Sequence, residues 1–362
     1  MAEREAGPVY IRAIWAAVGA IIVLWFLFKF TGTFILFFFA LVLAISMNAP
    51  VVALEKRRVP RWAGTGIVCL AIAAIVALLM VLVVPRLTEQ LTTLAGNLPT
   101  YAANLSREIS GWFSGYPSVQ QKLQLSGGEA ANQLPSAMDV VSRVGKISLS
   151  LIEVIFILVV VASAVIYLLV DPRPLLRAYV LALPERAREP GVRAFTRASR
   201  MVVGWMWSNI VVGAIEAVAA SIFLSIIGVP GALVWGAFAL FAELVPRIGG
   251  YIMATPPILV ALSVNPIMAV WVALFYLITN ELAGNLVAPV VRGTTMEIHP
   301  VVILFYTIAM ASAFGLVGAL IATPLAAFVK AYYDEFYLAR RSPPEHLEAQ
   351  VRTMLERAPE RR

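Results

Sequence analysis

The sequence predicts an all-α polytopic membrane protein, on the strength of three observations. Sixty per cent of its 362 residues are hydrophobic, whereas only 14 per cent are charged. Several apolar runs approach the roughly 20 residues with which a helix crosses a bilayer. Runs such as AIWAAVGAIIVLWFLF are apolar around the whole circumference of a helix, so lipid rather than water is expected to cover them.

We expect about eight transmembrane helices. Five well-separated apolar runs cover residues 10–28, 32–53, 63–84, 149–170 and 202–227. Proline and glycine interrupt the remaining apolar sequence, which divides into crossings or re-entrant pairs at 231–262, 265–286 and 300–333. No small-residue cleavage site follows the first run, so we interpret it as a retained span and not as a signal peptide.

Composition divides the chain into five segments. These are an N-terminal three-span unit (1–85), an extracytoplasmic amphipathic helical insertion (86–148), a fourth span with a basic cytoplasmic loop (149–200), a C-terminal transport core with broken helices (201–335) and a charged cytoplasmic tail (336–362). Whether the insertion binds a ligand stays open, because aromatic side chains near a membrane more often serve as anchors.

The positions of lysine and arginine predict the orientation. These residues gather after the second span, after the fourth span and in the tail, and such clusters favour the cytoplasmic side. Even numbers of spans connect the three clusters, so both termini are expected in the cytoplasm of a multi-pass protein in the inner (plasma) membrane. The net charge of +7 therefore needs no nucleic acid to explain it, since anionic lipid headgroups attract the same residues.

The basic loop 171–200 is expected to form an amphipathic helix at the inner interface. Its arginines alternate with leucine and valine, a pattern typical of helices that lie in the headgroup region.

Sequence motifs of common enzymes are missing. The chain contains no G-x-x-x-x-G-K-[ST] phosphate loop, no H-E-x-x-H zinc motif and no G-x-S-x-G nucleophile motif. The two histidines, His299 and His346, are far apart in the sequence, and Cys69 is the single cysteine. We therefore expect no enzymatic activity, no cofactor and no metal site.

Polar residues inside the apolar runs are the candidate functional residues, because an ionised group near mid-membrane costs on the order of 3 kcal/mol. Asn209, Gly213 and Glu216 stand at positions i, i+4 and i+7, so one helix face carries all three. This face either lines a solute or ion pathway or joins neighbouring helices through hydrogen bonds, and the sequence leaves both roles open.

The stretch FAELVPRIGG at 241–250 predicts a break in a helix. Pro246 cannot donate a backbone hydrogen bond, while Gly249 and Gly250 permit a tight backbone path. Unwound backbone at membrane depth persists only where protein or a water-filled cavity satisfies its polar groups. Glu243 would then lie near the end of a half-helix, where it could attract a cation or exchange a proton. Its alternative role is an ion pair with Arg247.

A second polar cluster lies in LITNELAGNLVAPVVRG. Here Glu281 and Asn285 are four residues apart and Asn280 adjoins them. The full set of candidate pathway residues is Asn209, Glu216, Glu243, Arg247, Asn280, Glu281 and Asn285. The candidate helix breaks are Pro246, Gly249, Gly250, Pro256, Pro289, Gly315, Gly318 and Pro324.

The motifs PRIGGYIMATPPILVAL, NELAGNLVAPVVRG and HPVVILFYTIAMASAFGLVGALIATPLAAF resemble those of the autoinducer-2 exporter family of bacterial membrane proteins. The resemblance extends over nearly the whole chain. It implies eight spans and export of the quorum-sensing signal autoinducer-2, and for some members exchange of sodium or lithium for protons. The family's proline, glycine and asparagine pattern falls on Pro246, Gly249, Pro256, Asn285, Pro289, Pro300, Gly315, Gly318 and Pro324.

One departure from the family pattern bears on helix packing and on the substrate. Met310 and Ala311 stand where members often carry a glycine pair.

We therefore expect a secondary transporter that exports a small polar solute, driven by an ion gradient because no ATPase motif is present. A monovalent cation/proton antiporter is the alternative within transport. A non-transporting membrane scaffold or accessory subunit is the alternative from another class. The expected partners are the lipid bilayer, the solute and a coupling ion; a homo-oligomer is left open.

Overall fold

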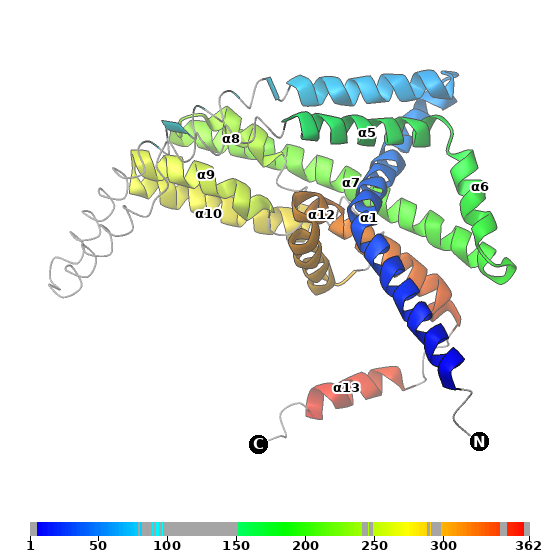
Figure 1. The fold of residues 1–362 in the computed structure, drawn as a ribbon. Helices are drawn as coiled ribbons and strands as arrows, with labels where there is room; N and C mark the ends of the chain where they lie inside the picture. Colours follow the sequence, from blue (N-terminus) through cyan, green and yellow to red (C-terminus); the bar gives the residue numbers. More distant parts are fainter. Residues whose placement is uncertain are drawn as a thin grey trace.

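The computed structural model describes residues 6–78, 151–240, 249–287, 298–340 and 346–357, with isolated positions between 80 and 96 and at 245 and 290. Every regular element in these segments is a helix (Figure 1). Five helices are long and apolar enough to cross a membrane, or six if the bent pair after residue 154 counts as one span. The prediction of an all-α polytopic membrane protein is confirmed. The predicted insertion 86–148 lies outside the described residues, apart from a few isolated positions.

Helix α1 (Ala6–Lys56) is continuous through residues 28–32, where two separate spans were expected to meet. With 51 residues it is roughly 75 Å long, more than twice the ~30 Å hydrocarbon core of a bilayer. The part with the length and hydropathy of a span is Lys29–Lys56. The prediction of two separate spans, 10–28 and 32–53, is therefore wrong for this helix. A single glycine such as Gly32 is tolerated inside a helix.

A turn at Arg58, which has a positive φ of 68°, leads into the helix Arg61–Leu78. This helix and α5 (Leu151–Val170) lie side by side in Figure 1 and share an apolar cluster with α1. Ala44, Val68 and Val165 represent the three helices in that cluster.

An elbow follows α5. Helix α6 (Arg173–Ala182) leaves it at an angle of 84°, after Asp171 and Pro172. Leu183 is extended and Pro184 precedes α7 (Glu185–Ile227), so the basic segment 171–200 is divided between α6 and the first turns of α7.

Helices α8 (Ala232–Ala239) and α10 (Pro266–Leu282) pack against the second half of α7, and α9 (Gly249–Val264) packs against α8 and α10. The turn from α7 to α8 uses positive φ angles of 84° at Gly228 and 74° at Gly231, which glycine adopts without steric cost. A short π-helix, η2 (Ala283–Val287), extends α10.

Helix α12 (Pro300–Phe336) is bent sharply at Gly315, where φ is 61° and ψ is −143°. Across the bend, the backbone of Gly318 contacts the carbonyl of Met310. In a straight helix these residues would be about 12 Å apart along the axis, so the two arms of α12 turn back toward each other. A 3₁₀ turn (Leu338–Arg340) and the short helix α13 (Leu347–Arg357) follow.

Candidate functional site

The predicted polar face of α7 is buried in the protein. Asn209 is 3% exposed and Glu216 is 4% exposed, and Gly213 between them is also buried. A side chain on Gly213 would place its Cβ 2.7 Å from the carbonyl oxygen of Leu240, the residue that follows α8. The polar face of α7 therefore lies directly against the end of α8.

Tyr276 of α10 lies within electrostatic reach of this face. Its side chain is 5% exposed and interacts electrostatically with Glu216. The phenol oxygen is buried and makes no hydrogen bond within the described residues. The sequence prediction omitted Tyr276, although its spacing of four residues from Asn280 places both on one face of α10.

Asn280 lies one turn further along α10, against the first turn of α9. The backbone of Gly250 packs directly on the Asn280 amide, so a side chain at position 250 would displace that amide. The Asn280 nitrogen Nδ2 is buried and, within the part of the chain that the structure describes, has no hydrogen-bond acceptor. Tyr276 and Asn280 thus form a row of polar groups in the interior between α7, α9 and α10.

Glu281 and Asn285 come together as expected, but at an exposed position. Glu281 accepts a hydrogen bond of 2.9 Å from the Tyr251 hydroxyl and one of 2.7 Å from the Asn285 amide. All three side chains are exposed. Glu281 therefore differs from the buried Glu216, and its hydrogen bonds tie α9, α10 and η2 to one another.

The segment between α8 and α9 is not helical at its described positions. Helix α8 ends at Ala239, Val245 lies in a bend, and α9 begins at Gly249. Glu243, Pro246, Arg247 and Pro289 lie outside the described residues, so the roles expected of them stay predictions.

Among the other expected helix breaks, Gly315 departs from helical geometry whereas Pro256, Gly318 and Pro324 lie inside helices. Neither proline ends its helix. Membrane helices tolerate proline where other groups compensate the lost hydrogen bond.

The basic start of α7 is joined to the end of α12 by ion pairs. Arg193 Nε lies 3.0 Å from Glu335, and Arg197 Nη2 lies 3.1 Å from Asp334. Lys330 also pairs with Asp334. We call these five residues the α7–α12 clamp. Sequence reasoning missed it because nothing local connects residues that are 142 positions apart, as Arg193 and Glu335 are.

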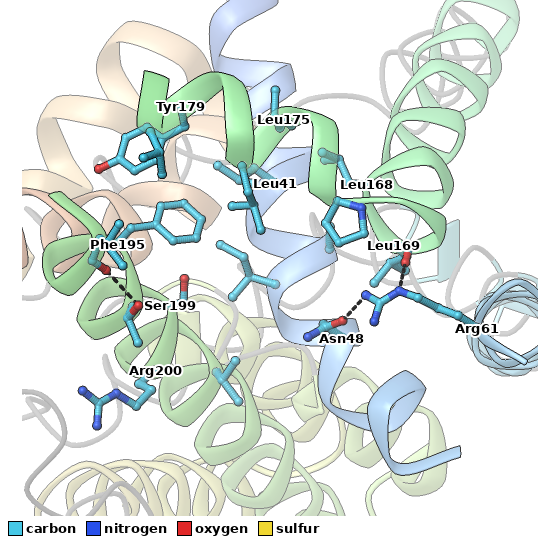
Figure 2. A pocket seen from close by; sticks show the side chains of 18 residues that line it. Leu41, Asn48, Arg61, Leu168, Leu169, Leu175, Tyr179, Phe195, Ser199 and Arg200 are labelled. Carbon is cyan, nitrogen blue, oxygen red and sulfur yellow. Dashed lines mark hydrogen bonds between the residues drawn. The ribbon is translucent and has the colours of Figure 1, made fainter. Parts of the chain in front are cut away.

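A second feature absent from the predictions is a cavity of about 660 Å³ at the α5–α6 elbow. Figure 2 shows its side chains, which come from α1, α5, α6, α7 and Arg61. Arg61 anchors one wall by donating hydrogen bonds of 2.7 Å to the carbonyl of Leu169 and to Asn48. The apolar walls of the cavity include Leu41, Leu168 and Phe195.

Metal binding finds no support in the described segments. No group of three or more His, Cys, Asp or Glu side chains in them could hold a metal ion.

Comparison with known proteins finds one matching family and several similar bacterial proteins. Residues 14–338 match the AI-2E family transporter family. The AI-2 transport protein TqsA of Escherichia coli (strain K12) is 26% identical over 298 residues, which cover 81% of this chain and 83% of TqsA. YueF of Bacillus subtilis (strain 168) is 26% identical over 294 residues, covering 78% and 79%. MT0215 of Mycobacterium tuberculosis (strain CDC 1551 / Oshkosh) is 27% identical over 317 residues, covering 84% and 83%.

The names of YueF and MT0215 give them a provisional transport role. The family match spans well over half of the chain and includes every helix of the polar interior. This chain therefore belongs to the AI-2E family of transporters and is a multi-pass membrane transporter.

Proposed function

We propose that the protein exports a small polar solute, driven by an ion gradient, through the interior between α7, α9 and α10. The observation that carries this proposal is the burial of Glu216 on the same face of α7 as Asn209, within electrostatic reach of Tyr276 on α10. Ionisable side chains within membrane spans are costly, and they are typical of substrate and ion pathways. Transporters also place such groups where helices are discontinuous, and Val245, between α8 and α9, lies in a bend.

The polar groups of this interior divide naturally into two roles. The Tyr276 hydroxyl and the Asn280 amide are uncharged, which suits hydrogen bonding to a polar solute. The Glu216 carboxylate is suited to the coupling ion. Glu243 and Arg247 belong to the same proposal, with Glu243 as a second acidic group of the pathway. The name of the relative TqsA supports autoinducer-2 as the first solute to test.

The proposed orientation follows the basic clusters. Both termini and the segment 171–200 are placed in the cytoplasm, and the membrane is the inner (plasma) membrane. The α7–α12 clamp then lies at the cytoplasmic end of the protein.

A monovalent cation/proton antiporter is the second candidate. Glu216 favours it, because a buried carboxylate can carry a proton in one step and a sodium or lithium ion in the next. Under this alternative the polar row on α10 contributes oxygen ligands to the cation and binds no organic solute.

The first experiment measures flux in sealed proteoliposomes under imposed pH or sodium gradients, with autoinducer-2, sodium and lithium as cargo. We expect Glu216→Gln to lower flux about ten-fold per folded molecule, equivalent to ~1.4 kcal/mol, and to abolish its dependence on the gradient. The matched control is Glu185→Gln, which neutralises an exposed carboxylate in the first turn of α7. It should transport like the wild type.

Two outcomes would contradict the proposal. Wild-type flux with an unchanged pH profile in Glu216→Gln would make the carboxylate structural. Gradient-driven exchange of sodium or lithium without any flux of autoinducer-2 would favour the antiporter.

A further inference from the structure

The cavity at the elbow is apolar in most of its lining. Aliphatic side chains of α1, α5 and α6 line it, among them Leu41, Leu168 and Leu175, which Figure 2 labels. Val180 of α6 belongs to the same lining. Its volume of about 660 Å³ falls in the range of ~300–1,000 Å³ that is typical of ligand sites. An apolar space of this size accommodates a hydrocarbon chain.

A second hollow, of about 700 Å³, adjoins the cavity and contains several charged side chains. The two spaces share Arg61 and Pro172 in their linings, so they meet at the elbow itself. Arg173 and Arg177 of α6 line the hollow, together with the acidic side chains Glu55 and Asp171.

The charges of the hollow leave it cationic toward a ligand. Arg61 pairs with Glu55 at 3.3 Å. This pair leaves Asp171 as a single carboxylate against Arg173 and Arg177. Within the described residues, no ion pair involves the guanidinium groups of Arg173 or Arg177. Both side chains are exposed, so they are accessible to an anion.

We propose that the elbow binds an anionic phospholipid of the surrounding bilayer, with an acyl chain in the cavity and the phosphate at Arg173 and Arg177. A free phosphate ion would use the hollow but has no use for the apolar cavity, whereas a neutral lipid would use the cavity but gain nothing from the arginines. Basic pockets beside membrane helices bind such headgroups on the cytoplasmic side. That is the side to which the basic segment 171–200 is assigned.

The binding experiment uses the full-length protein in detergent micelles and counts bound lipids by native mass spectrometry. Phosphatidylglycerol and phosphatidylcholine with identical acyl chains are titrated in parallel, and glycerol phosphate serves as a headgroup without chains. We expect phosphatidylglycerol to bind more tightly than phosphatidylcholine and glycerol phosphate not to displace it.

Two pairs of variants test the two spaces separately. Arg177→Gln should weaken phosphatidylglycerol binding about five-fold, whereas the control Arg186→Gln, an exposed arginine outside both spaces, should not. Val180→Phe places a larger side chain in the cavity and should weaken the binding of both phosphatidylglycerol and phosphatidylcholine. Its control, Val218→Phe, adds the same volume at an exposed position of α7. Thermal unfolding checks that Val180→Phe folds, and Arg177→Gln tests the proposal independently at an exposed position.

Three results would overturn the proposal. Equal affinity for the two lipids would remove the role of the arginines, and wild-type binding by folded Val180→Phe would remove the acyl chain from the cavity. Displacement of phosphatidylglycerol by glycerol phosphate would make the hollow a site for free phosphate esters.

Discussion

The described residues before and after the α5–α6 elbow bury different side chains. Between residues 14 and 170 the buried polar residues are Ser46 and Thr65, and Ser46 donates to the Val42 carbonyl of its own helix. Between 185 and 336 they are Ser208, Asn209, Glu216, Thr307, Thr323 and Asp334. The first region presents apolar surface to lipid and carries no buried charge among these residues. The polar interior that the proposed transport requires belongs to the second region.

Glycine serves the two regions differently as well. At Gly19, Gly32 and Gly66 a side chain would meet open space. Gly213, by contrast, lies against the backbone that follows α8, and Gly236 lies against Ser221 and the carbonyl of Ala217 on α7. Close approach of this kind is typical of helices that associate in a membrane through small residues. The close packing of α7 and α8 in the second region therefore depends on glycine at positions 213 and 236, where a side chain would clash.

The largest expected effect is the loss of stability in Gly213→Ala. The added methyl group would lie 2.7 Å from a backbone oxygen, that of Leu240, which cannot rotate away as a side chain does. We expect the free energy of unfolding to fall by about 1–3 kcal/mol. The control Gly66→Ala should leave stability unchanged or raise it by up to ~1 kcal/mol, since alanine favours helix. Thermal unfolding in detergent measures both, and equal shifts would contradict the contrast between the regions.

The α7–α12 clamp gives the next effect. Asp334→Asn keeps the shape of the side chain but removes the charge that pairs with both Arg197 and Lys330. We expect a loss of about 1–2 kcal/mol, less than for a fully buried pair because Arg197 is 40% exposed. The control Glu189→Gln removes a pair of 3.8 Å with a carboxylate that is 92% exposed and should cost at most ~0.5 kcal/mol. If unfolding experiments give the two variants the same stability, the clamp is not a structural joint.

The smallest effect on stability is expected for Tyr276→Phe, within about 1 kcal/mol of the wild type. The substitution removes a buried hydroxyl that has no hydrogen-bond partner among the described residues, so few contacts are lost. Solute flux in proteoliposomes should nevertheless fall if this hydroxyl binds the solute. Tyr167→Phe, at a side chain of α5 that is 78% exposed, should change neither quantity. Unchanged flux in both variants would remove Tyr276 from the pathway.

The local features of the chain could be predicted, and the reasons are physical. Helical periodicity placed Asn209 and Glu216 on one face, and that face is buried. The conformational freedom of glycine marked Gly315, which has a positive φ. Rules based on single residues were less successful for proline, because the surroundings keep Pro256 and Pro324 inside their helices.

Features that join distant segments could not be predicted. The α7–α12 clamp pairs residues with no local relation in the sequence, and the elbow cavity requires four helices and Arg61 to meet. Tyr276 looked like an ordinary aromatic residue of an apolar helix, and only its position near Glu216 distinguishes it. Such information resides in tertiary packing, which one sequence does not display.

Helix α12 changes direction sharply at a single residue, Gly315. Gly315 adopts a backbone conformation that residues with a side chain rarely occupy, and Gly318 leaves space for the carbonyl of Met310. The orientation of residues 300–314 therefore depends on two positions at which a side chain is absent. A side chain at either position would displace the whole arm, together with the apolar cluster that Tyr306, Met310 and Phe314 form with Phe38 and Phe39 of α1.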